Sequence, residues 1–129
     1  MSNQTQLNLD RLAAERAQEI IKRTADKKAS EVDNTVTKAL GVLQENGVYA
    51  CFLYLLAKEG DNGRVVVEEM LNLLEGFGFG WNKPSEDSAA EILKHISENV
   101  TANLERLLLA KETLEQMLIY ARYGAKARG

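Results

Sequence analysis

Hydrophobic residues recur along this chain every three to four positions, which is the spacing of α-helices that bury one face. No stretch alternates apolar and polar residues in the way that predicts a β-strand. The periodic segments predict helices over about 8–28, 30–45, 48–58, 64–75, 86–99 and 100–126. The last two are either one continuous helix or two helices with a kink near Thr101. We therefore expect an all-α fold, a compact bundle of five to six helices.

Each predicted helix carries an apolar stripe that should face a shared core. On the first, second and last helices, the inward positions are Ala13, Ala14, Ala17, Ile20, Ile21, Thr24, Val32, Val36, Ala39, Leu40, Leu43, Leu104, Leu107, Leu114, Met117, Leu118, Ala121 and Ala125. The segment 48–58 differs because it is apolar on nearly every side. We expect it to be the central and most buried helix.

Glycine-rich stretches mark the breaks between these helices. Asn46-Gly47 predicts a turn with left-handed backbone geometry, and residues 59–63 predict a loop. Residues 76–84 form the longest irregular stretch and carry three aromatic side chains, which could stack on bases or, as we prefer, fold against the bundle and cover its core. Ser85 is the expected N-cap of the helix that follows.

With 129 residues the chain has the size of one domain, so we expect a single domain over 1–129 with a flexible N-terminus at 1–7. The first ten residues are polar and lack the apolar segment of an export signal. The longest apolar run, 47–57, is too short to span a bilayer. The sequence therefore predicts a cytoplasmic protein with no membrane partner.

The residues needed for catalysis or metal binding are scarce. One cysteine and one histidine exclude an intramolecular disulfide and multi-histidine metal sites. Cys51 lies in the most apolar helix, where a thiol behaves as a small hydrophobic side chain. His95 lies one helical turn from Glu91, and an ordinary ion pair or a partly exposed side chain is expected there. We therefore expect no enzymatic activity, no cofactor and no metal.

Charge is unevenly distributed along the chain. The net charge of −3 combines +1 over 1–40, −6 over 41–110 and +2 over 111–129. A free-standing nucleic-acid-binding protein is usually strongly basic, which this chain is not. Two basic ends can still line a groove that is built together with other proteins.

A basic edge flanks the apolar stripe of the first predicted helix. Arg16, Arg23 and Lys27 lie within about 40° of one another around the helix axis, and Lys22 adds charge nearby. A plainer interpretation stays open, in which these cations form intrahelical ion pairs such as Arg23 with Glu19.

A second basic edge lies on the last predicted helix. Lys111, Arg122 and Lys126 share one face beside the apolar stripe, and Arg128 extends this face. The plainer interpretation here is that cations near a helix C-terminus compensate the negative end of its dipole.

Three segments resemble the small α-helical subunit of type III-B CRISPR RNA-guided effector complexes, the Cmr complexes. Arg16-Ala17 with Ile20-Ile21 is similar to the basic, alanine-rich first helix of that family. Residues 43–58 are similar to its Asn-Gly turn and the following apolar helix that ends in lysine. Lys111-Glu112-Thr113-Leu114 and Arg122-Tyr123 are similar to its last helix.

This resemblance implies a non-catalytic subunit that stacks with copies of itself in a filament alongside larger CRISPR effector subunits. It implies contact with the guide RNA–target RNA duplex through phosphates, which position a strand without reading its sequence. The candidate contact residues are Arg16, Lys22, Arg23, Lys27, Lys58, Lys111, Arg122 and Lys126. The alternative is a cytoplasmic helical-bundle adaptor between proteins, without nucleic acid, whose basic edges are plain solvated surface.

Overall fold

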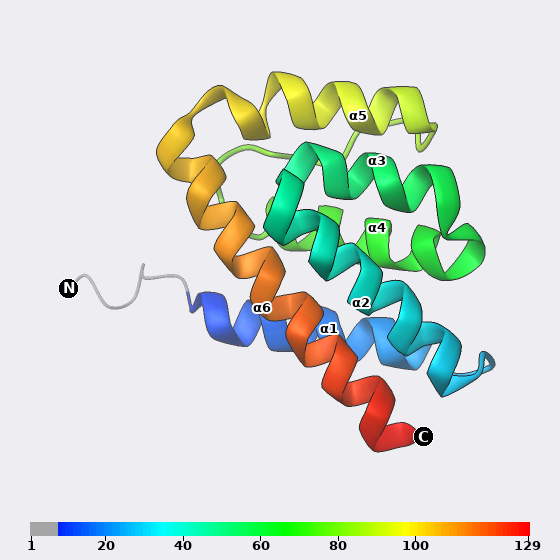
Figure 1. Ribbon diagram of the computed structural model, residues 1–129. Helices are drawn as coiled ribbons and strands as arrows, with labels where there is room; N and C mark the ends of the chain where they lie inside the picture. Colours follow the sequence, from blue (N-terminus) through cyan, green and yellow to red (C-terminus); the bar gives the residue numbers. More distant parts are fainter. Residues whose placement is uncertain (1–7) are drawn as a thin grey trace.

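The computed structural model describes residues 8–129 and shows an all-α bundle of six α-helices and one short 3₁₀ turn (Figure 1). The expected fold class is confirmed. The predicted flexible N-terminus at 1–7 lies outside the described residues. The elements are α1 (Leu9–Arg23), α2 (Ala29–Asn46), α3 (Val48–Lys58), α4 (Gly60–Glu75), α5 (Ala89–Glu98), η2 (Val100–Ala102) and α6 (Leu104–Arg128).

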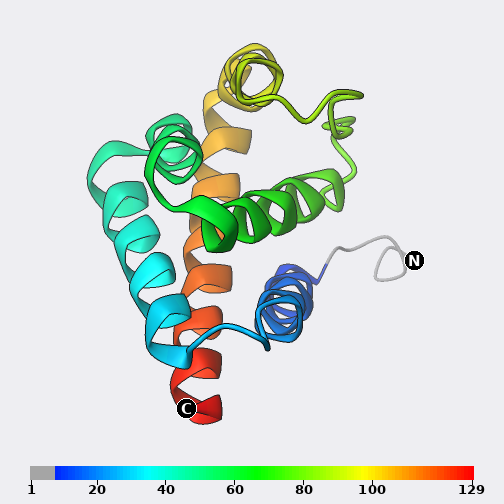
Figure 2. The same ribbon diagram turned by 90° about the vertical axis from the view of Figure 1, so that its right-hand side faces the viewer.

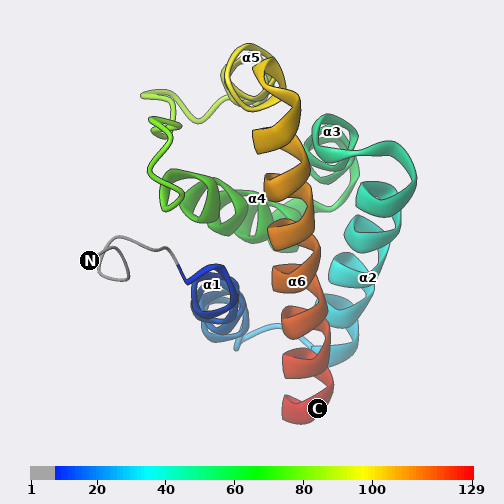
Figure 3. The same cartoon turned by 90° about the vertical axis from the view of Figure 1, so that its left-hand side faces the viewer.

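The longest helix, α6, runs the length of the bundle and packs against both α1 and α2 (Figure 3). Helix α4 lies above α1 on the same side of α6 (Figures 2 and 3), and it contacts α1 and α3. Helix α5 covers the end of the bundle opposite the C-terminus, where it packs on α3 (Figures 1 and 2). The two basic edges predicted from sequence therefore lie on helices that are packed against each other.

The first helix ends at Arg23, five residues earlier than the predicted end at Lys28. The buried hydroxyl of Thr24 donates a hydrogen bond to the carbonyl of Ile20 at 2.7 Å. The guanidinium of Arg128 donates to the Thr24 carbonyl at 2.9 Å and to the Lys27 carbonyl at 2.6 Å. Because α6 supplies these donors, the carbonyls at the end of α1 are satisfied without further helix.

The predicted loop over 59–63 is wrong, because Gly60 to Gly63 form the first turn of α4. Gly63 is buried where α4 begins against α3, and a Cβ there would lie 2.8 Å from the carbonyl oxygen of Leu55. This glycine permits a close approach of two backbones. Glycine is also typical of flexible loops, and for this reason the sequence predicted a loop here.

The fifth helix begins at Ala89, and its N-cap is Ser88 instead of the predicted Ser85. The Ser88 hydroxyl accepts a hydrogen bond from the Glu91 amide at 3.3 Å. The preceding segment is held by Arg64, which donates to the carbonyl of Asp87 at 2.9 Å. After α5, the 3₁₀ turn η2 separates it from α6, so the last two helices are two elements and not one.

The core contains buried side chains from all six α-helices. The prediction that 48–58 is the most buried helix is wrong, because Tyr49 and Leu53 are 41% and 46% exposed on its outer face. Helix α4 is buried over more of its surface and includes a buried carboxylate, Glu69. Leu104, predicted to face inward, is the first residue of α6 and is 68% exposed. The other inward positions predicted on α1, α2 and α6 are buried or half-buried.

The glycine–aromatic segment after α4 folds against the bundle, as preferred from the sequence. Phe77 and Trp81 are buried, and Phe79 is half-buried with its ring centroid 5.0 Å from that of Trp81. The Arg106 guanidinium lies 4.3 Å above the Phe79 ring. The two buried rings are therefore part of the core and are not available to stack on bases.

Candidate nucleic-acid interface

The eight candidate cations divide into two groups within residues 8–129. Arg16, Arg23, Lys27 and Lys126 form ion pairs with carboxylates of other helices, whereas Lys22, Lys58, Lys111 and Arg122 form none. The sequence could not distinguish these groups, because the partner carboxylates are 34 to 93 positions away in the chain. Cations without an internal partner can bind a phosphate without first breaking a contact.

Arg16 and Arg23 converge from α1 on the buried carboxylate of Glu69 in α4. Each guanidinium lies 2.8 Å from one Glu69 oxygen, and the amide of Asn72 donates to the same carboxylate at 3.2 Å. Glu69 is 3% exposed, so this arrangement compensates a charge that burial would otherwise strongly disfavour. The two arginines therefore have a structural role in joining α1 to α4.

Arg23 also binds Glu68, on the more exposed side of the same helix. This hydrogen bond is the main reason why the pKa of Arg23 is raised above its ordinary value. The intrahelical pair of Arg23 with Glu19 that the sequence suggested is thus replaced by contacts with α4.

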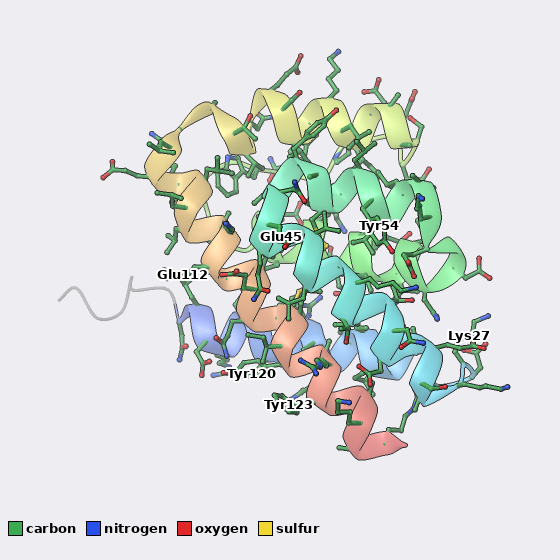
Figure 4. All side chains as sticks on the ribbon, viewed as in Figure 1. Lys27, Glu45, Tyr54, Glu112, Tyr120 and Tyr123 are labelled. Carbon is green, nitrogen blue, oxygen red and sulfur yellow. The ribbon has the colours of Figure 1, made fainter. Side chains whose placement is uncertain are left out.

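Lys27 and Lys126 form looser ion pairs at the lower end of the bundle. Lys27 is labelled at the right of Figure 4, and its Nζ atom lies 3.7 Å from the exposed carboxylate of Asp61. The Nζ atom of Lys126 lies 3.0 Å from Asp33 of α2. Hydrogen bonds from Lys126 and then Thr37 lower the pKa of Asp33. Both lysines remain partly exposed, and surface pairs of this kind contribute little stability.

Lys111, Arg122 and Lys126 follow the edge of α6 that faces α2. Their positions span about 22 Å along the helix axis at 1.5 Å per residue. Lys111 and Arg122 are half-buried, and the Nε atom of Arg122 is buried without a hydrogen-bond partner. Glu115 shares this edge and Asp33 contacts it, so the row of three cations and two carboxylates has a net charge of +1.

The remaining candidate cations that form no ion pair within residues 8–129 lie apart from this row. Lys22 is exposed near the end of α1, and Lys58 is exposed at the end of α3. Arg128, which the sequence suggested as an extension of the basic face, instead points its guanidinium at the carbonyls that end α1. The structure therefore gives Arg128 a structural role.

The thiol of Cys51 is buried and the imidazole of His95 is half-buried. Burial raises the pKa of Cys51 to about 12, and its Sγ atom lies 3.4 Å from the carbonyl of Ala39. Burial lowers the pKa of His95, so the neutral imidazole is favoured in the folded state. Within residues 8–129, no three histidine, cysteine, aspartate or glutamate side chains lie close enough together to hold a metal ion.

One polar cluster that the sequence did not suggest lies between α2, α3 and the start of α4. The carboxylate of Glu59 accepts hydrogen bonds from Tyr54 at 2.6 Å and from Thr35 at 2.9 Å. The hydrogen bond to Glu59 is the main reason why the pKa of Tyr54 is raised to about 12. Because Thr35 lies on α2 and Tyr54 on α3, their hydrogen bonds to Glu59 hold the junction between α3 and α4 against both helices.

Sequence reasoning also missed Glu69, although a signal was present. Glu68 and Glu69 lie between Val66-Val67 and Met70-Leu71, and Glu69 falls at the helical spacing of the apolar Val66 and Leu73. A carboxylate in the middle of a buried pattern indicates a paired charge.

Comparisons with protein-family models, with curated proteins and with solved structures found no match to this chain. In the part of the chain from residue 8 onward, none of the helices combines the length and the apolar character needed to cross a bilayer.

Proposed function

We propose that this chain is the non-catalytic small subunit of a type III CRISPR RNA-guided effector complex. In this proposal it lies in a filament with copies of itself and larger effector subunits. It contacts the backbone of the guide RNA–target RNA duplex without reading the sequence. The family resemblance of three segments supports the proposal, and the distribution of cations without ion pairs is compatible with it.

The observation that carries the proposal is the row of Lys111, Arg122 and Lys126 along one edge of α6. Two of these cations have no carboxylate partner within residues 8–129, whereas Arg11, Arg16 and Arg23 of α1 each have one. Their common edge on a rigid helix, with spacings of about 16 Å and 6 Å along the axis, suits contacts with several phosphates of one extended strand. The two segments of α6 that resemble the family's last helix, 111–114 and 122–123, contain two of the three cations.

Salt dependence of RNA retention tests this proposal on the complex purified through a tag on this chain. Lys111→Gln combined with Arg122→Gln removes two phosphate contacts. The slope of log RNA affinity against log salt concentration should therefore become less steep by about 2. Lys94→Gln, an exposed lysine on α5, is the matched control and should leave the slope unchanged. An unchanged slope in the double variant would show that this edge of α6 does not contact RNA.

The carboxylate in the row provides a test in the opposite direction. Glu115→Gln removes a negative charge between Lys111 and Arg122 and should tighten RNA retention, because a phosphate no longer meets a like charge. Glu98→Gln, an exposed carboxylate on α5, serves as the control. Equal retention by the two variants would contradict contact at this edge.

The alternative function, an adaptor between proteins without nucleic acid, is favoured by a different observation. Five large apolar side chains are 41–68% exposed, and four of them form two pairs one helical turn apart that can contact another protein: Tyr49 with Leu53, and Leu104 with Leu108, besides the single Tyr123. An adaptor would purify with protein partners alone, and charge substitutions on α6 would not change its binding.

A further inference from the structure

The dipeptide Asn-Gly occurs twice in the chain, and its two copies lie in different surroundings. Asn46-Gly47 joins α2 to α3, whereas Asn62-Gly63 belongs to the first turn of α4. An asparagine followed by glycine is prone to lose its side-chain amide, because glycine has no Cβ to shield its backbone nitrogen. The fold therefore places one reactive dipeptide at a helix end and the same dipeptide inside a helix junction.

The reaction begins with an attack of the glycine nitrogen on Cγ of the preceding asparagine. A bond forms between this nitrogen and Cγ, and the bond from Cγ to the side-chain nitrogen breaks. Ammonia leaves and carries away the proton of the glycine nitrogen. Water then opens the resulting cyclic imide at either carbonyl, which yields aspartate or isoaspartate. Water is the only co-reactant, so the change needs neither an oxidant nor an enzyme.

The surroundings of Asn46 permit each of these steps. Asn46 is the last residue of α2 and is exposed, so water can reach Cγ and hydrate the negative charge that develops on Oδ1. Gly47 has a φ of +98°, and no atom of a more distant residue lies within 4 Å of the place a Cβ would take. The attacking nitrogen is therefore open to its own side of the turn.

One contact at Asn46 opposes the reaction. The Gly47 amide donates a hydrogen bond to the carbonyl of Leu43 at 3.0 Å, which must open before the nitrogen can attack. This is the last hydrogen bond of α2, and hydrogen bonds at helix ends open locally without unfolding of the bundle. The contact therefore slows the reaction but does not prevent it.

The surroundings of Asn62 oppose the same steps more strongly. Its Oδ1 atom is buried without a hydrogen-bond partner within residues 8–129, so a negative charge developing there is neither hydrated nor compensated. Gly63 is buried against α3, where a Cβ would lie 2.8 Å from the carbonyl oxygen of Leu55. Its amide donates to the Glu59 carbonyl at 3.1 Å. Freeing this nitrogen therefore requires the α3–α4 junction to open.

We propose that Asn46 is a site of spontaneous conversion to aspartate and isoaspartate in the folded protein, whereas Asn62 is protected by the fold. Gly47 donates to Leu43 in α2 and accepts from the Cys51 amide in α3 at 3.1 Å. Isoaspartate adds a methylene group to the main chain just before Gly47. The connection between α2 and α3 is therefore weakened in the modified chain.

Peptide mapping of the full chain after incubation in mildly alkaline buffer tests this proposal. Mass spectrometry detects the change from amide to carboxylate at each position, and enzymatic methylation of isoaspartyl carboxylates identifies that product. In the folded chain, conversion at Asn46 should be more than about tenfold faster than at Asn62, because Asn62 reacts only when the junction opens.

Two controls separate the effect of the fold from that of the sequence. In urea both dipeptides are accessible, so their rates of conversion should become similar. Asn46→Gln should abolish conversion at this position, because the longer side chain must close a larger ring. A thermal melt shows that this variant is folded. After incubation, the wild type should contain a fraction with a lower Tm, and Asn46→Gln should not.

Three results would overturn the proposal. The first is conversion at Asn62 as fast as at Asn46 in the folded chain. The second is an unmodified Asn46 over a period in which the sample in urea is converted. The third is a modified fraction that melts at the Tm of the unmodified chain, which would contradict the weakened connection between α2 and α3. None of these measurements involves RNA, so they leave the salt-slope test of the α6 edge unaffected.

Discussion

Glu69 shows how a single side chain can determine the role of its neighbours. Its buried carboxylate receives both Arg16 and Arg23, so two of the cations expected to bind phosphate also join α1 to α4. A substitution of either arginine would therefore change both charge and stability. Lys111 and Arg122 carry no such double role within residues 8–129 and are better probes of RNA contact.

Glu69→Gln is expected to destabilise the protein by about 2–4 kcal/mol, because it leaves two partly buried guanidinium groups without their counter-charge. Urea denaturation measures this change. Glu68→Gln is the matched control, since Glu68 is 37% exposed, and it should lower the free energy of unfolding by less than about 1 kcal/mol. Equal effects of the two substitutions would contradict the structural role of the buried carboxylate.

His95 predicts a pH dependence of stability. Burial lowers its pKa in the folded state, so a proton binds the unfolded chain more readily than the folded one. The contribution of the neutral imidazole is fully present above the unfolded pKa of about 6.5 and is lost as the pH falls toward the lower folded pKa. His95→Gln should reduce the drop in Tm between pH 7.5 and 5.5. If Tm falls by the same amount in the variant and in the wild type, His95 is not the cause of this pH dependence.

At the scale of the elements, two glycines within helices have different roles. Gly63→Ala should destabilise the protein by about 1–3 kcal/mol, because its Cβ would clash with the Leu55 carbonyl where α3 and α4 meet. Gly41→Ala is the control, since it lies within α2 with open space around a new Cβ, and it should stabilise by about 0.5–1 kcal/mol. Thermal unfolding measures both, and destabilisation by both would contradict the tight α3–α4 junction.

Helix positions were predictable from the sequence, whereas helix ends depended on contacts between helices. The apolar periodicity correctly placed segments that bury Val32, Val36 and Met117. The end of α1 was misplaced because Arg128, more than one hundred positions away, satisfies its carbonyls. Similarly, Gly63 suggested a loop because the sequence alone does not show that another backbone lies close to it.

At the scale of the whole molecule, the fold was predictable from the sequence, whereas the partners of its charged side chains were not. Periodicity and the scarcity of proline were sufficient to predict an all-α bundle. The ion pairs of Arg16, Arg23 and Lys126 form between segments that are distant in the chain, so no local pattern shows them. The burial of Asn62-Gly63 likewise depends on how α3 and α4 pack.

The most direct test of the central claim is purification of the tagged full chain from its native cells, with identification of the proteins and nucleic acid that accompany it. We expect larger effector subunits together with a guide RNA, and an absorbance ratio at 260 and 280 nm that shows bound nucleic acid in every preparation. Protein partners recovered repeatedly without any nucleic acid would contradict the claim and support the adaptor.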